Sequence, residues 1–133
     1  MKTAVDSSVI LDVLVDDPKF ASRSETALRK AASEGALVVC ECVVAEIRPA
    51  FENVSIEEFL ADWNIEFSAS TRASALLAGD MFAAYLRRRR AGSSRVVADF
   101  LIGANAMLSA DRLLARDRGY YRDYFQRLVL LTP

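Results

Sequence analysis

The chain has 133 residues, 53% of them hydrophobic and 26% charged, which is typical of one folded soluble domain spanning residues 1–133 rather than of a disordered or fibrous protein. It contains no histidine, which excludes Ser-His-Asp hydrolases, Cys-His proteases, histidine-dependent ribonucleases and His-ligated zinc sites. The net charge of −1 conceals an acidic half, residues 1–66 with six basic and thirteen acidic side chains, and a basic half, residues 67–133 with eleven arginines and five acids.

Five short apolar runs of strand length alternate with helical patterns along the whole chain. The runs are Thr3–Val5, Ala36–Cys40, Trp63–Phe67, Arg112–Ala115 and Leu128–Leu131. The resulting order, β-α-α-β-α-α-β-α-α-β-α-β, predicts a parallel sheet with crossover helices, that is, a three-layer α/β/α sandwich. Ligands of such folds bind beyond the carboxyl ends of the strands, so functional residues are expected directly after the strands.

Capping signals and apolar periodicity predict the positions of the helices. Ser22 with Glu25, and Ser55 with Glu58, have the spacing of a capping box at a helix start. The faces expected to be buried are Ile56, Phe59, Leu60 and Trp63; Ala73, Leu77, Met81 and Ala84 in a helix that runs to Arg90; and Val97, Leu101, Ala104 and Leu108.

Two aspartates directly follow predicted strands. Asp6 comes after the first strand and Asp117 after the fourth, so in a parallel sheet both lie at the same edge. Each also has a structural interpretation, because Asp6 can cap a helix and Asp117 can be a turn residue paired with a neighbouring arginine.

Two further acids are each the only charge in an apolar stretch. Glu46 lies in a helical turn after the second strand, and Asp99 lies within Val96–Ile102. A carboxylate among aliphatic side chains is costly to bury unless it is paired or bound to a metal. In a helix, Asp99 stacks over Gly103 and Ala106, small residues that are expected to leave a groove.

Convergence of these four carboxylates would require a cation. Each pair repels by roughly 3 to 4 kcal/mol at about 5 Å and an effective dielectric constant of about 20. Oxygen donors without histidine or cysteine select a hard ion, Mg²⁺ or Mn²⁺. Such an ion lowers the pKa of bound water and neutralises phosphodiester charge, so water can attack without any imidazole. The sequence therefore predicts metal-dependent hydrolysis of a phosphodiester.

The same residues resemble the motifs of the PIN-domain family and, within it, of the VapC-type toxins of bacterial toxin–antitoxin pairs. The matching motifs are Val5–Ser8, Val44–Ile47, Ala98–Ala104 and Leu114–Tyr121. The resemblance covers the whole chain and implies a five-stranded parallel sheet flanked by helices, with metal-dependent endoribonuclease activity. It also implies an RNA substrate, a cognate VapB-type antitoxin that blocks the site, and a homodimer.

Position within those motifs implies a role for each residue. The acidic quartet, which in the family is catalytic and holds one or two Mg²⁺ ions, resembles Asp6, Glu46, Asp99 and Asp117. Ser7 resembles the hydroxyl beside the first acid, which hydrogen-bonds within the site, although it can also cap a helix. Two positions depart from the pattern: Ala115 stands where many relatives carry Thr or Ser, and Asn105 where some close relatives carry His.

The basic half of the chain supplies the candidate substrate contacts, Arg87, Arg88, Arg89, Arg90, Arg95, Arg116 and Arg118. The opposite net charges of the two halves fit either an acidic cleft rimmed by arginines or halves whose charges neutralise each other across the core. The run Arg87–Arg90 fits either phosphate binding or a solvated helix C-terminus whose dipole favours cations. Arg116 and Arg118 bracket Asp117, which favours substrate binding or organisation of the site.

The tyrosines and cysteines have structural interpretations as well. Tyr120, Tyr121 and Tyr124 can stack on bases, but such a cluster more often packs beneath a terminal strand. Cys40 and Cys42 are too few for a disulfide framework, and we expect buried, reduced thiols in the cytoplasm. The longest stretch without a charge, Phe100–Ala110, has eleven residues, fewer than the ~18 of a membrane span, and the acids near the N-terminus do not fit a signal peptide.

Two other functions remain alternatives. A receiver-like phosphoacceptor domain has a similar size and clustered acids, but it needs a lysine late in the chain, and the lysines here are Lys2, Lys19 and Lys30. A non-catalytic PIN-like binding module is expected to have lost at least one acid of the quartet, whereas all four are present.

Overall fold

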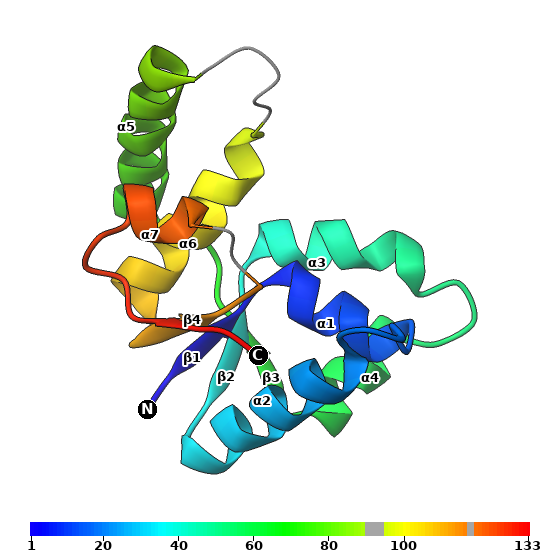
Figure 1. Cartoon of the computed structure of the whole chain (residues 1–133). Helices are drawn as coiled ribbons and strands as arrows, with labels where there is room; N and C mark the ends of the chain where they lie inside the picture. Colours follow the sequence, from blue (N-terminus) through cyan, green and yellow to red (C-terminus); the bar gives the residue numbers. More distant parts are fainter. Residues whose placement is uncertain (90–94, 117–118) are drawn as a thin grey trace.

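The computed structural model describes residues 1–89, 95–116 and 119–133, and its centre is a five-stranded parallel sheet (Figure 1). The strands are β1 (Thr3–Val5), β2 (Leu37–Val39), β3 (Ile65–Phe67), β4 (Arg112–Leu114) and β5 (Leu130–Leu131), and each lies within a predicted apolar run. Their spatial order is β3-β2-β1-β4-β5, and every neighbouring pair is parallel. Receiver domains have the order 2-1-3-4-5, so the receiver-like alternative is wrong.

Helices cover both faces of the sheet. They are α1 (Ser7–Leu14), α2 (Ala21–Glu34), α3 (Glu41–Ile47), the 3₁₀ helix η1 (Arg48–Ala50), α4 (Ile56–Asp62), α5 (Arg72–Arg88), α6 (Val97–Ser109) and α7 (Tyr120–Tyr124). The right-handed crossovers that lead from β1 through β2 to β3 place α1, α2 and α4 on one face of the sheet (Figure 1). The chain then returns to β4 and β5 on the other side of β1, which places α5, α6 and α7 on the opposite face. The three-layer prediction is confirmed.

The inner strands are buried from both sides. All residues of β1, β2 and β4 are buried, including Val5, Leu113 and Leu114 with 1% exposure or less. Burial on both faces explains why these strands are continuous apolar runs rather than alternating patterns. The carboxyl ends of β1 and β4 are adjacent, since Val5 pairs with Leu114, so the residues after these strands lie side by side.

The hairpin of α5 and α6 projects beyond the sheet (Figure 1). An aromatic cluster holds it to α7. Phe100, which is fully buried, lies with its ring centroid 5.1 Å from Tyr120, 5.3 Å from Phe82, 5.5 Å from Tyr85 and 5.7 Å from Tyr124. The rings of Tyr120 and Tyr121 are buried too, and Tyr120 packs on Phe100 of α6.

Two predicted helix ends differ from the structure. α2 begins at Ala21, so Ser22 and Glu25 lie inside the helix and form no capping box; Asp17 instead accepts the backbone N–H groups of Lys19 and Phe20 ahead of it. α5 ends at Arg88, because the backbone of Arg89 is extended. The predicted helix start at Ser55 is confirmed, since its hydroxyl accepts the N–H of Glu58.

The buried face of α6 also differs from the prediction. Val97 and Leu108 are about half exposed, and the buried residues are Phe100, Ile102, Gly103, Ala104, Asn105 and Ala106. The reason is that α6 packs against α5, α3 and β4 at once, which widens and rotates its buried arc. No groove lies over Gly103, because a Cβ there would be 2.4 Å from the ring of Phe125, which fills that space.

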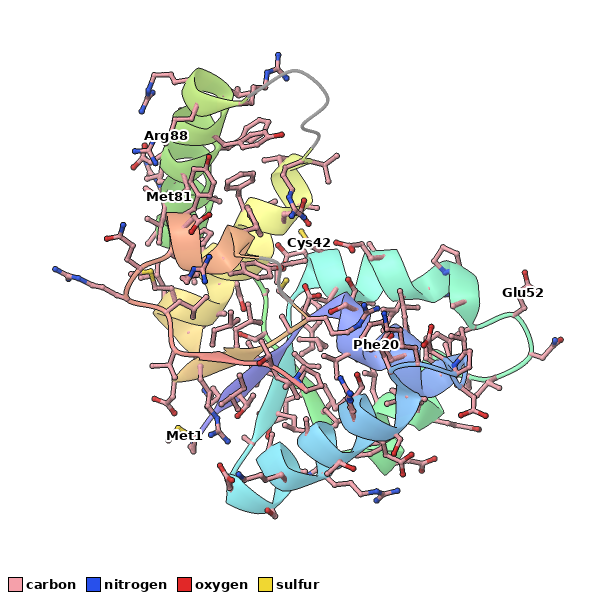
Figure 2. The ribbon with its side chains drawn as sticks, in the orientation of Figure 1. Met1, Phe20, Cys42, Glu52, Met81 and Arg88 are labelled. Carbon is pink, nitrogen blue, oxygen red and sulfur yellow. The ribbon has the colours of Figure 1, made fainter. Side chains whose placement is uncertain are left out.

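The two cysteines are unpaired thiols near the start of α3, where Figure 2 labels Cys42. Cys40 is buried, whereas Cys42 is only partly buried. Burial raises the pKa of both thiols, that of Cys42 to about 12, so both are protonated at neutral pH. Among the described residues, no helix is long and apolar enough to cross a membrane.

Candidate active site

Asp6 lies at the carboxyl end of β1 and forms the N-cap of α1, as the capping interpretation predicts. Its Oδ2 accepts the backbone N–H of Ser8 at 3.1 Å and the Ser8 hydroxyl at 2.5 Å. Its Oδ1 accepts the hydroxyl of Tyr121 at 2.8 Å. The side chain is 8% exposed, so these donors fix a nearly buried carboxylate at the centre of the sheet edge.

Glu46 reaches the same edge from α3. Its Oε2 accepts the Ser7 hydroxyl at 2.8 Å, and because Asp6 is the cap of α1, the Ser7 side chain is not used for capping. Burial of the carboxyl group raises the pKa of Glu46; the bond from Ser7 opposes that shift, and the negative charges of Asp6 and Asp99 add to it. Glu46 is therefore within electrostatic reach of both aspartates.

Asp99 lies in the first turn of α6 and is partly buried. Its Oδ2 accepts the backbone N–H of Val96 at 3.3 Å, which ties the carboxylate to the helix start. Burial raises the pKa of Asp99, and the charge of Asp6 adds to this, while the bond from Val96 and the positive charge of Arg95 act in the opposite direction.

A polar cavity of about 300 Å³ opens between these elements. The described residues that line it are Asp6, Ser7, Ser8, Arg95, Asp99, Arg116, Tyr120 and Tyr121. The structure thus brings Asp6, Glu46 and Asp99 to one edge of the sheet, whereas Asp117 and Arg118 lie outside the described residues. Within the part of the chain that the structure describes, no three acidic, histidine or cysteine side chains are gathered closely enough to form a metal centre as they stand.

The described arginines that were predicted to contact the substrate lie in two places. Arg95 and Arg116 line the cavity, and the guanidinium of Arg95 lies 4.6 Å from the centre of the Tyr120 ring. Arg87, Arg88 and Arg89 are exposed at the end of α5, and Figure 2 shows Arg88 on this projecting helix. Arg90 lies outside the described residues.

Comparison with known proteins identifies the family. The family model of the PIN domain matches residues 3–125, which is most of the chain. The chain belongs to the PIN domain family. No curated protein matches the sequence.

Solved structures of similar fold cover nearly the whole PIN domain. A chain of VapBC2 from Rickettsia felis, solved bound to a promoter DNA fragment, has 14% identity and a TM-score of 0.71, with 100% of this chain and 99% of that chain covered. A chain of FitAB bound to the IR36 DNA fragment has 17% identity and a TM-score of 0.70, with 98% and 94% covered. A chain of FitAcB from Neisseria gonorrhoeae has 17% identity and a TM-score of 0.67, with 97% and 96% covered. At sequence identities this low, the similarity of the structures establishes a shared fold and nothing more.

Two residues of this PIN domain site were not recognised from the sequence. Tyr121 was assigned only to stacking or packing, yet its hydroxyl holds Asp6 from 115 positions away in the chain. Asp12 is 2% exposed and pairs with Arg116. Its signal was present, because Asp12 is the only charge in the apolar helix α1, the same criterion that selects Glu46 and Asp99.

Asn105, at the position where some relatives carry His, is buried in α6. Its side-chain amide donates to the backbone carbonyl of Ser68 at 3.2 Å, and it does not line the cavity. The structure therefore gives Asn105 a bond between α6 and the segment that follows β3.

The raised pKa of Asp99 predicts a pH-dependent stability difference. The pKa of Asp99 is higher in the folded protein than in the unfolded chain, where it is about 4. Below the unfolded-state pKa the group does not affect the free energy of unfolding. As the pH rises through the folded-state pKa it lowers that free energy, and above the folded-state pKa the loss is complete. Asp99→Asn removes this cost. Without divalent cations, the variant should melt at a higher temperature than the wild type at pH 7, and the difference should vanish as the pH falls below about 4.

Melting curves between pH 3.5 and 8 measure this effect. The control is Asp80→Asn, which changes an exposed aspartate in α5 and should follow the wild-type curve at every pH. A difference between wild type and Asp99→Asn that does not depend on pH would contradict the electrostatic origin.

Proposed function

We propose that this PIN domain protein is a metal-dependent endoribonuclease toxin of the VapC type. The observation that carries the proposal is that Asp6 and Asp99 line one cavity beside the carboxyl end of β1, and that Ser7, which lines the same cavity, donates its hydroxyl to Glu46. Membership of the PIN domain family and the similarity to chains of VapBC2 and FitAB support it. The protein would act through its one PIN-like domain, residues 1–133, on RNA in the cytoplasm.

The donor set fits a hard divalent cation. The three side chains offer carboxylate oxygens, and after burial the next influence that raises the pKa of Asp99 is the charge of Asp6, a repulsion that a cation relieves. We infer that Asp6, Glu46, Asp99 and Asp117 hold Mg²⁺, with Mn²⁺ as a substitute. The chemistry that Mg²⁺ supplies in such sites is activation of water and neutralisation of phosphate charge.

Residues of the chain orient these acids and attract the substrate. Ser8 and Tyr121 fix the two oxygens of Asp6, and Ser7 fixes Oε2 of Glu46. Arg95, stacked on Tyr120 at the cavity, places a positive charge where an RNA phosphate would enter. Arg118 and the run Arg87–Arg90 would add phosphate contacts.

Two protein partners belong to the same proposal. A cognate VapB-type antitoxin would cover the cavity and prevent cleavage, and the toxin itself would form a homodimer. Support comes from the fold, since the similar chains belong to VapBC2, FitAB and FitAcB structures. Gel filtration of the toxin alone, and of the toxin mixed with a candidate VapB-type antitoxin, measures both.

Metal removal tests the activity. The purified protein is expected to cleave structured RNA in Mg²⁺ or Mn²⁺, to lose cleavage in excess EDTA, and to regain it when either ion is restored, because the proposed acids act by holding the ion that activates water and neutralises phosphate charge. Sequencing of the RNA ends would identify the target and the cut site. RNA binding without cleavage in either ion would instead indicate the non-catalytic binding module.

A further inference from the structure

A partly buried ion pair adjoins the candidate site, since its arginine, Arg116, lines the cavity. Asp12, on α1, is 2% exposed, and both of its oxygens accept bonds from Arg116, Oδ2 from Nε at 2.7 Å and Oδ1 from Nη2 at 2.9 Å. The hydroxyl of Ser24 on α2 donates to Oδ2 at 2.6 Å. A two-point arginine–carboxylate pair of this kind fixes the orientation of both side chains.

The other contacts of the Arg116 guanidinium are also internal. Its centre lies 4.0 Å from the centre of the Phe20 ring, which precedes α2 and is labelled in Figure 2. The side chain is 33% exposed. Two of its donors and one of its faces are therefore committed to α1 and the start of α2, which leaves it poorly placed to contact an RNA phosphate.

The backbone of Arg116 connects this pair to the first acid of the site. Its N–H donates to the Ser8 hydroxyl at 3.2 Å, and the same hydroxyl donates to Oδ2 of Asp6 at 2.5 Å. A continuous chain of bonds thus runs from Asp12 through Arg116 and Ser8 to Asp6. Asp117 is the next residue in the sequence.

We propose that Asp12 and Arg116 are positioning residues that hold the end of β4 and the Ser8–Asp6 contact in register, and that Arg116 does not bind RNA phosphate. This inference rests on the proposed ribonuclease function, and of the two roles that the sequence left open for Arg116, substrate binding and organisation of the site, it selects the second. An arginine that contacts phosphate and one that orients the site have opposite consequences when Asp12 is altered.

Asp12→Asn distinguishes the two roles. If Arg116 bound phosphate, loss of the buried carboxylate would free its guanidinium and lower the KM for RNA. If the pair positions Asp6, Asp12→Asn should lower kcat about tenfold with little change in KM, and it should raise the Mn²⁺ concentration needed for half-maximal activity, as loss of an orienting contact does.

The double variant Asp12→Asn/Arg116→Gln tests the role of Arg116 without the risk that Arg116→Gln alone unfolds the protein. Arg116→Gln alone leaves a buried carboxylate without its cation, whereas the double variant removes both charges together. Its kcat should fall no further than that of Asp12→Asn, because the two residues act as one unit. The dependence of log KM on log salt should keep the wild-type slope, whereas loss of a phosphate contact would reduce that slope by about one.

Arg29→Gln is the matched control. Arg29 also donates through Nε and Nη2 to a carboxylate, Glu25, and lies 4.9 Å from the centre of an aromatic ring, Trp63, but this pair is exposed on α2 outside the cavity. It should leave kcat, KM and the Mn²⁺ requirement unchanged.

A measurement that does not depend on activity separates this inference from the proposed function. Mn²⁺ should raise the melting temperature of the wild type and of Arg29→Gln, and raise that of Asp12→Asn by less at the same concentration. If the wild type fails to cleave RNA, the ribonuclease proposal is wrong and the melting shifts still decide the inference. Equal shifts in all three proteins, or a lower KM with unchanged kcat in Asp12→Asn, would overturn it.

Discussion

Asp99→Asn is expected to reduce RNA cleavage at saturating Mg²⁺ by about a hundredfold or more, because residues that only orient metal ligands already account for ten- to a hundredfold effects. The substitution keeps the size of the side chain and an oxygen that can accept the N–H of Val96, but it removes the negative charge that a cation requires. Initial rates of cleavage measured over a range of Mg²⁺ concentrations test this. Asp6→Asn should have an effect of the same size.

Controls for this result come from the same protein. Asp80→Asn changes an exposed aspartate within a helix, α5, and should retain full activity. Melting curves of Asp99→Asn must show a folded protein, which the predicted gain in stability at pH 7 would ensure. Wild-type activity in folded Asp99→Asn would show that Asp99 is not part of the site.

Phe100→Ala is expected to have the largest effect on stability. The Phe100 ring is fully buried and contacts aromatic rings from α5 and α7, so its removal should cost about 3 to 5 kcal/mol. For a chain of this length the melting temperature should fall by about 10 to 20 °C. Thermal and urea unfolding, followed by circular dichroism, measure both quantities.

Phe67→Ala is the matched substitution at an exposed site. Phe67 is 60% exposed at the end of β3, so the free energy of unfolding should change by about 0.5 kcal/mol or less. Since Asp99 directly precedes Phe100 in α6, the large loss would show that the aromatic cluster anchors the helix that carries this acid. A loss below about 1 kcal/mol for Phe100→Ala would contradict that role.

Local patterns predicted the elements but not every boundary. The strand runs were recognisable because buried parallel strands are continuously apolar, and Ser55 was recognisable because capping is a contact within one turn. The start of α2 was predicted two residues late, because Asp17, ahead of the helix, takes the cap-like contacts. The buried face of α6 depended on three neighbours that its own periodicity does not reveal.

The candidate site divides in the same way. Asp6, Glu46 and Asp99 could be selected from the sequence because a lone acid in an apolar stretch, or one directly after a strand, is unusual in either position. The same criterion applied to Asp12 would have selected it as well. Its partner could not be predicted, because Arg116 is 104 positions away and the sequence does not specify which of the eleven arginines of the basic half meets it.

By itself, then, the sequence determined which chemistry is open to the site: with no histidine, the candidate groups are isolated acids, oxygen donors of the kind that bind a hard cation. Only the tertiary structure decided which group each orienting side chain binds: Ser7 binds Glu46, Ser8 and Tyr121 bind Asp6, and Arg116 binds Asp12. The physical reason is that the residue types limit the available chemistry and the local periodicity determines the secondary structure. Hydrogen bonds across the sheet edge, by contrast, form between residues that only folding brings together.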